Sequence, residues 1–404
     1  MATVDPVRFL DRATPPHIFT LIVLTGLGAL SMNIFLPSLP QMSAHFATDY
    51  SVMQLSVALY LAVNAFLQIL IGPISDRYGR RPVLLWGVGV FLVATLGCIY
   101  APNIEVFLFF RMVQAMVVVG LVLGRAVVRD MYPADQAASQ IGYVTMGMAV
   151  VPMIGPAIGG VLDESFGWQA NFWLLFALGV AVLFLTWRDL GETARATSGS
   201  FAAQFREYPE LLASRRFWGY CLAAAFSSGA FFAYLGGAPF VGSEVFGLSP
   251  AAVGFYFGAP ALGYFFGNGI SGRFSVRLGI NTMVLWGAVI SAAGLSLSLL
   301  LFLLGFKSAL AFFGFMTFVG FGNGMVLPNA TAGMLSVRPH LAGTASGLGG
   351  AIMVGGGAAL SALAGVMLTG ETGAYPLILI MLIASLLGVA AIVYTIRRER
   401  RVLG

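Results

Sequence analysis

The chain has 404 residues, of which 59% are hydrophobic and only 9% are charged. Soluble domains carry about 45–50% apolar and about 25% charged residues, so this composition excludes a water-soluble fold. The net charge of +5 does not indicate a nucleic-acid partner, because the arginines follow a membrane topology as described below.

Apolar runs separated by charged or turn-rich breaks predict twelve transmembrane helices, since each helix needs about 20 residues to cross a bilayer. The first run continues past signal-peptide length into Pro37 and lacks a small-residue cleavage site, so we expect a retained span. The runs cover residues 17–40, 51–74, 82–101, 105–127, 138–162, 170–187, 215–240, 250–271, 281–303, 308–330, 341–369 and 373–396. Cys98 and Cys221 lie inside these runs and are expected to be buried thiols without a disulfide.

A charged segment separates the first six runs from the last six, and its side chains cannot lie in lipid. We therefore expect an amino-terminal bundle over residues 1–187, a cytoplasmic linker over 188–214 and a carboxy-terminal bundle over 215–404. If the amino terminus is cytoplasmic, the arginines outside the spans all fall on the cytoplasmic side, and Lys307 is the one basic residue opposite. The positive-inside rule then places both termini in the cytoplasm.

The two sets of runs also resemble each other. After the second run stands Ile74-Ser75-Asp76-Arg77-Tyr78-Gly79-Arg80-Arg81, followed by Leu85-Trp86-Gly87. After the eighth stands Ile270-Ser271-Gly272-Arg273-Phe274-Ser275-Val276-Arg277-Leu278-Gly279, followed by Leu285-Trp286-Gly287. This echo at about half the chain length indicates a duplication, and it predicts a binding site between the halves near the middle of the bilayer.

The loop after the second run carries the most specific motif, from Gly72 to Pro82. Its glycines, Gly72 and Gly79, allow a tight turn and a close helix approach, and Asp76 can pair with a neighbouring arginine. We expect a charge cluster that locks two helices in one conformation and releases them in another. A plain positive-inside loop is the alternative. The residues of this predicted gating loop are Gly72, Asp76, Arg77, Gly79, Arg80 and Arg81.

Arg111 lies about two turns into the fourth run, followed by Gln114. An arginine at membrane depth costs about 2.5–3.5 kcal/mol or more unless it faces protein or water, so we expect Arg111 to face a central cavity. Reaching back to the membrane surface is the alternative. Arg125 lies nearer the end of its helix, so both a position facing the cavity and a side chain that reaches the membrane surface remain open for it.

The fifth run carries Gly155-Pro156-Ala157-Ile158-Gly159-Gly160. A proline kink between small residues allows a neighbouring helix to approach closely and pivot, so we expect a hinge at Gly155, Pro156, Gly159 and Gly160. Close packing without a hinge is the alternative.

These segments together resemble the major facilitator superfamily, and within it the drug-resistance transporters of the bicyclomycin and chloramphenicol resistance (Bcr/CflA-like) group. The resemblance covers nearly the whole chain and also includes Asn33 to Pro40 and Arg125 to Asp130. It implies an all-α membrane fold of two pseudo-symmetric six-helix bundles, a role for Arg111 with Gln114 in substrate and proton coupling, and an antiporter-associated motif at 155–160. Val151 stands where the fuller motif carries glycine.

The first run departs further from the subgroup, which usually has an aspartate where this chain has Asn33. All sixteen acidic residues fall in loops or at helix ends, so we expect no buried carboxylate in either half. His17, His45 and His340 also fall at span ends or in loops. Proton coupling is therefore implied by the resemblance and not by a titratable group within the spans.

Aromatic and polar residues in the spans predict an apolar cavity with a few polar groups, which suits an uncharged, drug-sized ligand. Each aromatic taken alone is more simply a core or lipid-facing residue. The set comprises Asn33, Tyr60, Asn64, Gln68, Arg111 and Gln114 in the first half and Phe231, Phe232, Tyr234, Tyr256, Tyr264 and Asn323 in the second.

The leading hypothesis is a monomeric efflux transporter of small amphiphilic compounds in the bacterial inner membrane, working by exchange for protons. An uptake carrier or facilitator for a small organic anion paired with Arg111 is the alternative. A membrane enzyme or receptor is a further possibility, but the sequence contains no metal-ligand cluster or nucleophile motif that would support it. The sequence also lacks a phosphate-binding Gly-Lys-Ser/Thr loop, so we expect no cofactor and a proton gradient as energy source.

Overall fold

The computed structural model describes residues 8–14, 16–131, 151, 154–194, 208–338 and 341–403. Within these ranges the chain forms helices and no strand, as predicted. The first half contains α1 (Ile18–Asn33), η1 (Leu36–Ser38), α2 (Leu39–His45), α3 (Tyr50–Tyr78), α4 (Arg80–Ile99), α5 (Ile104–Gln114), η2 (Ala115–Val117), α6 (Val118–Met131), a helix over residues 154–166, and α8 (Gln169–Asp189). The second half contains α10 (Arg215–Phe240), η3 (Val241–Val245), α11 (Pro250–Tyr256), α12 (Gly258–Leu278), α13 (Ile280–Leu303), η4 (Leu310–Gly314), α14 (Met316–Val337), α15 (Ala342–Met367) and α16 (Tyr375–Leu403).

Ten of these helical segments are long and apolar enough to cross a membrane. Of the two further expected spans, residues 138–162 lie partly outside the described residues, and residues 250–271 correspond to α11 and α12. The described structure is thus a membrane-spanning helical bundle, and the full count of twelve stays a prediction.

Local sequence explains where several helices begin. The Asn103 side chain accepts a hydrogen bond from Val106 N at 2.9 Å and so caps α5. Ser249 caps α11 in the same way, with Pro250 at its first position. A capping oxygen satisfies one of the backbone N–H groups that a helix leaves unpaired at its start, and proline is pre-organised for that first turn.

Glycine ends α3 and α12 at corresponding points of the two halves. Gly79 and Gly279 follow these helices with φ of 95° and 81°, and both have ψ of 152°. Such positive φ values favour glycine, because a Cβ is strained there. The two loops that resemble each other in sequence thus make the same turn, which agrees with the predicted internal repeat.

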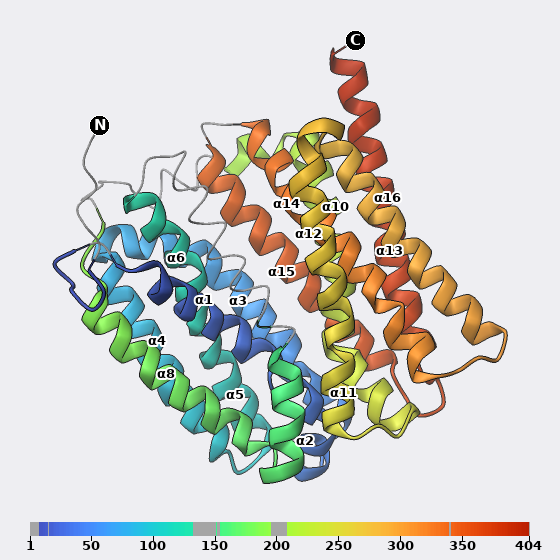
Figure 1. Ribbon diagram of the computed structural model, residues 1–404, viewed down its shortest axis with the longest axis horizontal. Helices are drawn as coiled ribbons and strands as arrows, with labels where there is room; N and C mark the ends of the chain where they lie inside the picture. Colours follow the sequence, from blue (N-terminus) through green and yellow to red (C-terminus); the bar gives the residue numbers. More distant parts are fainter. Residues whose placement is uncertain are drawn as a thin grey trace.

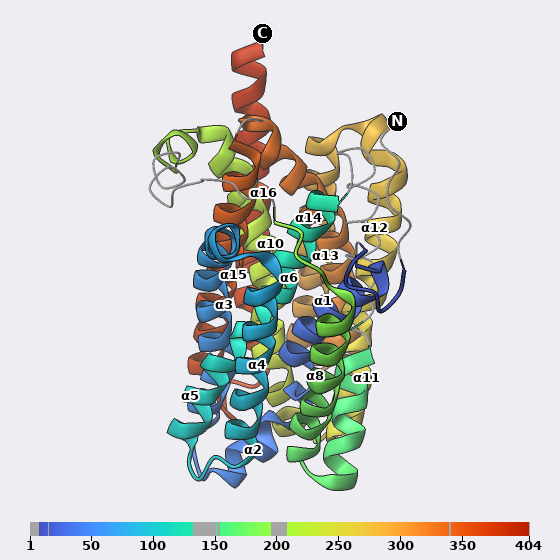
Figure 2. The same cartoon turned by 90° about the vertical axis from the view of Figure 1, so that its left-hand side faces the viewer.

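The two halves lie side by side, the first in blue to green and the second in yellow to red (Figure 1). We call the end of the bundle at which α16 finishes the proximal end, and the end that carries α2 and α11 the distal end (Figure 1). In the first half, α4 packs against α5 and α8, as the side view shows (Figure 2). Between the halves, α3 packs along α15, and η1 contacts α10 and α11 at the distal end.

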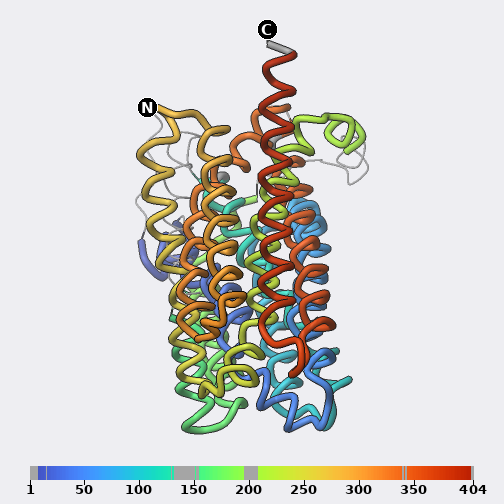
Figure 3. The backbone as a smooth tube through the Cα atoms, turned by 90° about the vertical axis from the view of Figure 1, so that its right-hand side faces the viewer, coloured from blue at the N-terminus to red at the C-terminus, as the bar shows by residue number. Residues whose placement is uncertain are grey.

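A polar network joins three helices at the proximal end of the second half. The Glu399 carboxylate on α16 accepts hydrogen bonds from Arg216 Nη2 at 2.6 Å, Tyr220 Oη at 3.0 Å and Asn281 Nδ2 at 2.5 Å. Its partners lie on α10 and α13, so Glu399 ties the ends of these helices to α16. Beyond this network α16 extends past the other helices (Figure 3).

Candidate functional site

A cavity of about 320 Å³ lies between the two halves. Its wall draws on α1, α3, η2 and α6 from the first half and on α10, α12, α14 and α15 from the second. It is mostly apolar, with a few amide and hydroxyl side chains, and Arg125 is the charged residue in its described lining. Such a composition suits a largely apolar ligand that offers a few hydrogen-bonding groups.

Most of the predicted cavity residues line this space. They are Asn33, Tyr60, Asn64, Gln68, Phe231, Phe232, Tyr264 and Asn323. The further lining residues that the sequence did not single out are mainly aliphatic side chains, such as Met32, Leu61 and Leu121. Their residue types recur throughout every span, so no sequence signal separates them from core residues.

Tyr234 and Tyr256 do not line the cavity, so this part of the prediction is wrong for the conformation described. The Tyr234 ring packs against Phe257 with centroids 5.0 Å apart, and the Tyr256 ring stacks on Phe313 at 4.8 Å. Both belong to an aromatic cluster of the second half. Phe257 itself lines the cavity, and so the cluster supports the wall from behind.

The polar side chains of the wall are held by short hydrogen bonds. Gln68 Nε2 donates to Asn64 Oδ1 at 2.7 Å, and Asn33 Nδ2 donates to the carbonyl of Ala29 at 2.7 Å. The Asn33 Oδ1 atom is buried without a hydrogen-bond partner in the described structure, and an unpaired buried acceptor of this kind is costly.

Arg111 is 1% exposed and does not line the cavity, contrary to expectation. Its guanidinium packs against the rings of Phe35 and Tyr60, with Cζ 4.3 Å and 4.1 Å from their centroids. It also donates to the carbonyl of Ser31 at 2.9 Å and to Gln114 Oε1. Tyr60 contacts both the guanidinium and the cavity, so Arg111 supports the wall through Tyr60 instead of forming it.

Gln114 extends this support to a neighbouring helix. It is fully buried, and its Nε2 donates to Thr95 Oγ1 on α4 at 2.8 Å. Arg111 and Gln114 therefore form one hydrogen-bonded unit joining α1, α4 and α5. The unit reaches the cavity only through its neighbours.

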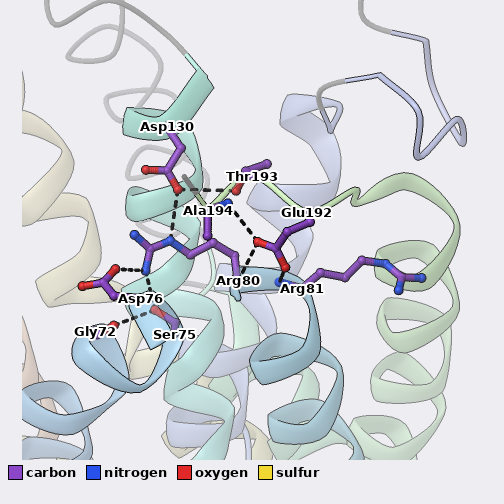
Figure 4. Close-up of polar contacts among 9 residues, drawn as sticks. All are labelled: Gly72, Ser75, Asp76, Arg80, Arg81, Asp130, Glu192, Thr193 and Ala194. Atoms are coloured by element: carbon purple, nitrogen blue, oxygen red, sulfur yellow. Dashed lines mark hydrogen bonds and ion pairs between the residues drawn. The ribbon is translucent and has the colours of Figure 1, made fainter. Parts of the chain in front are cut away.

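The predicted gating loop forms a charge cluster within the first half at the proximal end (Figure 4). Arg80 pairs with Asp76 at 2.5 Å and with Asp130 on α6 at 3.0 Å. It also donates to Ser75 Oγ, whose hydroxyl bonds the carbonyl of Gly72. The cluster thus joins the end of α3, the start of α4 and the end of α6.

Glu192, which sequence reasoning did not single out, completes this cluster (Figure 4). Its carboxylate accepts from the backbone N–H groups of Arg80 at 2.9 Å and Arg81 at 3.3 Å. A carboxylate at a helix start pairs unsatisfied N–H groups and opposes the positive end of the helix dipole. Arg77 lies apart from the cluster, with its guanidinium over the Tyr78 ring.

Of the predicted hinge residues, Gly159 and Gly160 lie where the backbones of neighbouring elements approach very closely. A Cβ on Gly159 would overlap the backbone carbonyl of Ile34, just after α1, and one on Gly160 would overlap that of Pro250 on α11. Reciprocally, a Cβ on Gly254 would overlap the carbonyl of Pro156. Helix 154–166 therefore touches α11 of the other half backbone to backbone.

Further contacts between the halves surround this one. Tyr50 Oη donates to the carbonyl of Gly236 at 2.8 Å, Gln54 Nε2 donates to the carbonyl of Ser361, and Glu164 Oε1 accepts from Ala251 N at 3.0 Å. We call these contacts and the glycine contacts between helix 154–166 and α11 the distal seal. It closes the end of the cavity opposite the gating loop.

Two carboxylates at helix ends are buried, which corrects the expectation of none. Asp189 is 0% exposed and accepts hydrogen bonds from Leu10 N, His17 N and Thr20 Oγ1 at 2.6–2.8 Å, so it fixes the start of α1. Asp163 is 3% exposed, and the nearby Ser38 hydroxyl acts to lower its pKa. The sequence placed both at helix ends correctly but did not show that neighbouring elements cover them.

Comparison with known proteins identifies the relatives of this chain. The sequence profile of the Major Facilitator Superfamily matches residues 21–362. The chain is 31% identical to the uncharacterized MFS-type transporter YdgK of Bacillus subtilis, over 95% of both chains. It is 30% identical to Multidrug resistance protein D of Escherichia coli, over 91% of this chain and 92% of that protein, and 32% identical to the Chloramphenicol resistance protein of Pseudomonas aeruginosa, over 81% and 79%.

A similar fold occurs among solved structures. The crystal structure of a bacterial homolog of the human lysosomal transporter Spinster, in an inward-facing and occupied conformation, superposes with a TM-score of 0.73. It covers 95% of this chain and 96% of that one at 19% identity. At this identity the likeness concerns the fold.

Proposed function

The chain belongs to the major facilitator superfamily, and we propose that it exports small, amphiphilic, drug-like compounds in exchange for protons. The observation that carries this proposal is the cavity of about 320 Å³ between the halves, with apolar walls and few polar groups. The names of two relatives, a multidrug resistance protein and a chloramphenicol resistance protein, point to the same class of substrate.

Transport proceeds by alternating access, in which the halves rock around the cavity. In the conformation described, the distal seal closes one end, and the cavity extends from Asn33 toward Arg125 and Gln68 near the other. The basic loops lie at the proximal end, so we assign that end to the cytoplasm and the protein to the bacterial inner membrane, as a monomer in lipid. A compound therefore enters from the cytoplasm and leaves when the distal seal opens.

The expected bundles, residues 1–187 and 215–404, are the two rocking units, joined by the linker 188–214. Tyr50, Gln54 and Glu164 of the first unit form hydrogen bonds to the second unit across this division.

Uptake or facilitated movement of a small organic anion is the second candidate. Arg125 favours it, because its side chain contributes a positive charge to the cavity wall and the described lining contains no carboxylate. Arg111, which the anion hypothesis first invoked, lies behind Tyr60 and does not offer its charge to the cavity directly.

Drug and proton movement in inverted membrane vesicles tests the proposal. With the protein present, chloramphenicol-like and cationic compounds are expected to accumulate when a pH gradient is applied, and a protonophore is expected to abolish this accumulation. Vesicles from cells with an empty vector give the background. Equilibration independent of the gradient, or movement of organic anions alone, would favour the second candidate.

A matched pair of variants links transport to the cavity. Phe231→Ala removes a ring from the cavity wall, whereas Phe265→Ala removes one that is 66% exposed on the outside of α12. Accumulation is expected to fall about tenfold in the first variant and to stay near the parent level in the second, since Phe231 lines the cavity and Phe265 does not. Equal effects of both changes would contradict the cavity as the binding site.

A further inference from the structure

Asp163 lies near the distal end of helix 154–166, covered by neighbouring elements. It is 3% exposed, and the Ser38 hydroxyl at the end of η1 lies near its carboxylate and acts to lower its pKa. Ser38 in turn accepts from Asn171 Nδ2 on α8 at 3.1 Å. The Gln41 side-chain amide on α2 lies 2.9 Å from Asp163 Oδ1 when its nitrogen faces the carboxylate. Asp163 thus connects helix 154–166 to η1 and α2.

The partners of Asp163 carry no compensating positive charge. Ser38, Gln41 and Asn171 are neutral, and among the described residues no lysine or arginine forms an ion pair with this carboxylate. Glu164 follows it in the chain, and α2 also carries His45, whose ring packs edge-on against Phe46 and Trp168. Burial, followed by the nearby Glu164 charge, raises the pKa of Asp163 to about 6, although the Ser38 hydroxyl opposes this rise.

Asp163 directly precedes Glu164, which forms one of the contacts of the distal seal. The Glu164 carboxylate accepts from the backbone of Ala251, and a hydrogen bond from Ser249 contributes to lowering its pKa. The first turn of α11 is thereby attached to helix 154–166. Since η1 packs against α10 and α11 of the other half, separating the halves at the distal end would disturb the cover over Asp163 and admit water.

We propose that Asp163 is a proton-binding site of the distal seal, and that binding a proton there from the distal side favours the sealed conformation. Opening the seal hydrates the carboxyl group and favours its ionised form. The proposal rests on the alternating access argued above, and it does not depend on which compound is carried. This direction of coupling between proton binding and sealing suits an exporter, because a proton bound from outside would favour closure of the seal after a substrate has left.

The sign follows from linkage between proton binding and conformation. The carboxyl of Asp163 has a pKa of about 6 in the sealed state, whereas a hydrated aspartate has a pKa of about 3.9. The ratio of sealed to open molecules therefore rises as the pH falls from about 7 to about 4, by at most about a hundredfold. Above about pH 7 both states are ionised, and the ratio no longer depends on this group.

A reporter cysteine at Ser361 tests the proposal in right-side-out vesicles without added drug. Ser361 is 0% exposed, and its carbonyl accepts from Gln54 across the seal, so Ser361→Cys reacts with a membrane-impermeant thiol reagent only when the seal opens. Its labelling rate is divided at each pH by that of Gly370→Cys, an exposed position in the turn before α16. The chain without a reporter gives the background from the buried Cys98 and Cys221.

Relative labelling of Ser361→Cys is expected to fall severalfold as the pH is lowered from 7.5 to 4.5. Asp163→Asn, which imitates the protonated group, is expected to give low labelling at every pH. Glu371→Gln, an exposed carboxylate in the same turn as Gly370, is expected to behave like the parent. Ser38→Ala is expected to move the midpoint to higher pH, because it removes the hydroxyl that lowers the pKa of Asp163.

Labelling of the parent that does not change with pH would overturn the proposal, and so would an Asp163→Asn variant that keeps the parent's pH dependence. Since no drug is present, these outcomes are separate from a failure of drug transport in inverted vesicles. A protein that moves no drug but shows the expected labelling would keep the proton site and lose the proposed substrate class.

Discussion

At the scale of single residues, Arg111 shows how a charge is accommodated inside the bundle without facing the cavity. Its guanidinium packs between two rings and donates to a backbone carbonyl and to Gln114, all within the first half. A planar cation of this kind uses stacking and directed hydrogen bonds that a lysine does not reproduce.

Arg111→Lys is therefore expected to lower transport by about tenfold or more for neutral, cationic and anionic compounds alike, since it weakens the support of Tyr60 and not a charge contact with the ligand. Initial rates with each class of compound in vesicles check this. Arg215→Lys, at an exposed position at the start of α10, serves as the control. Loss restricted to anionic compounds would instead show that Arg111 binds the substrate.

The sequence predicted most of the residues around the cavity, but it did not show which of them line the wall and which lie behind it. Asn64 and Gln68 were found because a polar side chain in an apolar run is rare and needs a partner. Tyr234 and Tyr256 were misplaced because an aromatic ring packs in a core as readily as in a cavity wall. The rings that pack against these two tyrosines, Phe257, Phe312 and Phe313, are far from Tyr234 or Tyr256 in the sequence or belong to other elements. Which ring faces the cavity depends on helix rotation, which packing decides.

At the scale of elements, helix 154–166 and α11 meet backbone to backbone across the two halves. Gly160→Ala would push a methyl group into the carbonyl of Pro250, and overpacking of this kind costs about 1–3 kcal/mol. The ratio of sealed to open molecules is therefore expected to fall about tenfold or more. Faster labelling of the Ser361→Cys reporter at pH 7.5, together with reduced transport, is the expected result.

Gly258→Ala provides the matched control, because a Cβ at Gly258 meets no atom within 4 Å. Its labelling and transport should stay close to those of the parent. If Gly160→Ala labels no faster than Gly258→Ala in protein of equal abundance, the backbone contact does not hold the seal closed.

The start of α4 depends on a carboxylate from a distant part of the chain. Glu192→Gln removes the charge that pairs with the Arg80 and Arg81 N–H groups, and a capping interaction of this kind is worth about 0.5–1 kcal/mol. The thermal midpoint of the purified protein is expected to fall by about 1–3 °C. Glu371→Gln, whose carboxylate is exposed in a turn, should leave the midpoint unchanged; an equal fall in both variants would contradict a specific capping role.

The element boundaries were largely predictable, because apolar runs end where charges and glycines begin, as at Gly79 and Gly279. The divisions inside several spans were not predictable, and two of these spans are examples. The expected span 17–40 is α1, η1 and part of α2, and the expected span 250–271 is α11 and α12. Hydropathy is averaged over a window, and it does not record the short changes of backbone geometry that redirect a helix.

At the scale of the whole molecule, the distal seal is closed and the cavity reaches toward the proximal end. Asn64→Cys, in the cavity wall, is therefore expected to react faster with an impermeant thiol reagent in inverted vesicles than in right-side-out vesicles, by about tenfold. A transported compound should slow this reaction by occupying the cavity. Faster labelling from the opposite side would reverse the proposed orientation or the resting conformation.

The internal repeat was visible in the sequence, and the matching turns at Gly79 and Gly279 agree with it. The contacts between the halves were not visible, since they join residues such as Gln54 and Ser361 that no local pattern relates. Long-range packing of this kind depends on the three-dimensional arrangement of all helices, and a single sequence does not encode it in a readable motif.

The network around Glu399 distinguishes the second half from the first. Where the first half has Asp76 and Arg80, the second has Val276, which is 95% exposed, and Ile280, and its helix ends are instead joined through Glu399, Arg216 and Asn281. The two halves thus hold their helix ends together with different side chains. The halves are therefore not interchangeable. A chimera carrying two first halves would contain the Arg80 cluster twice and would lack the Glu399 network that holds the end of α16.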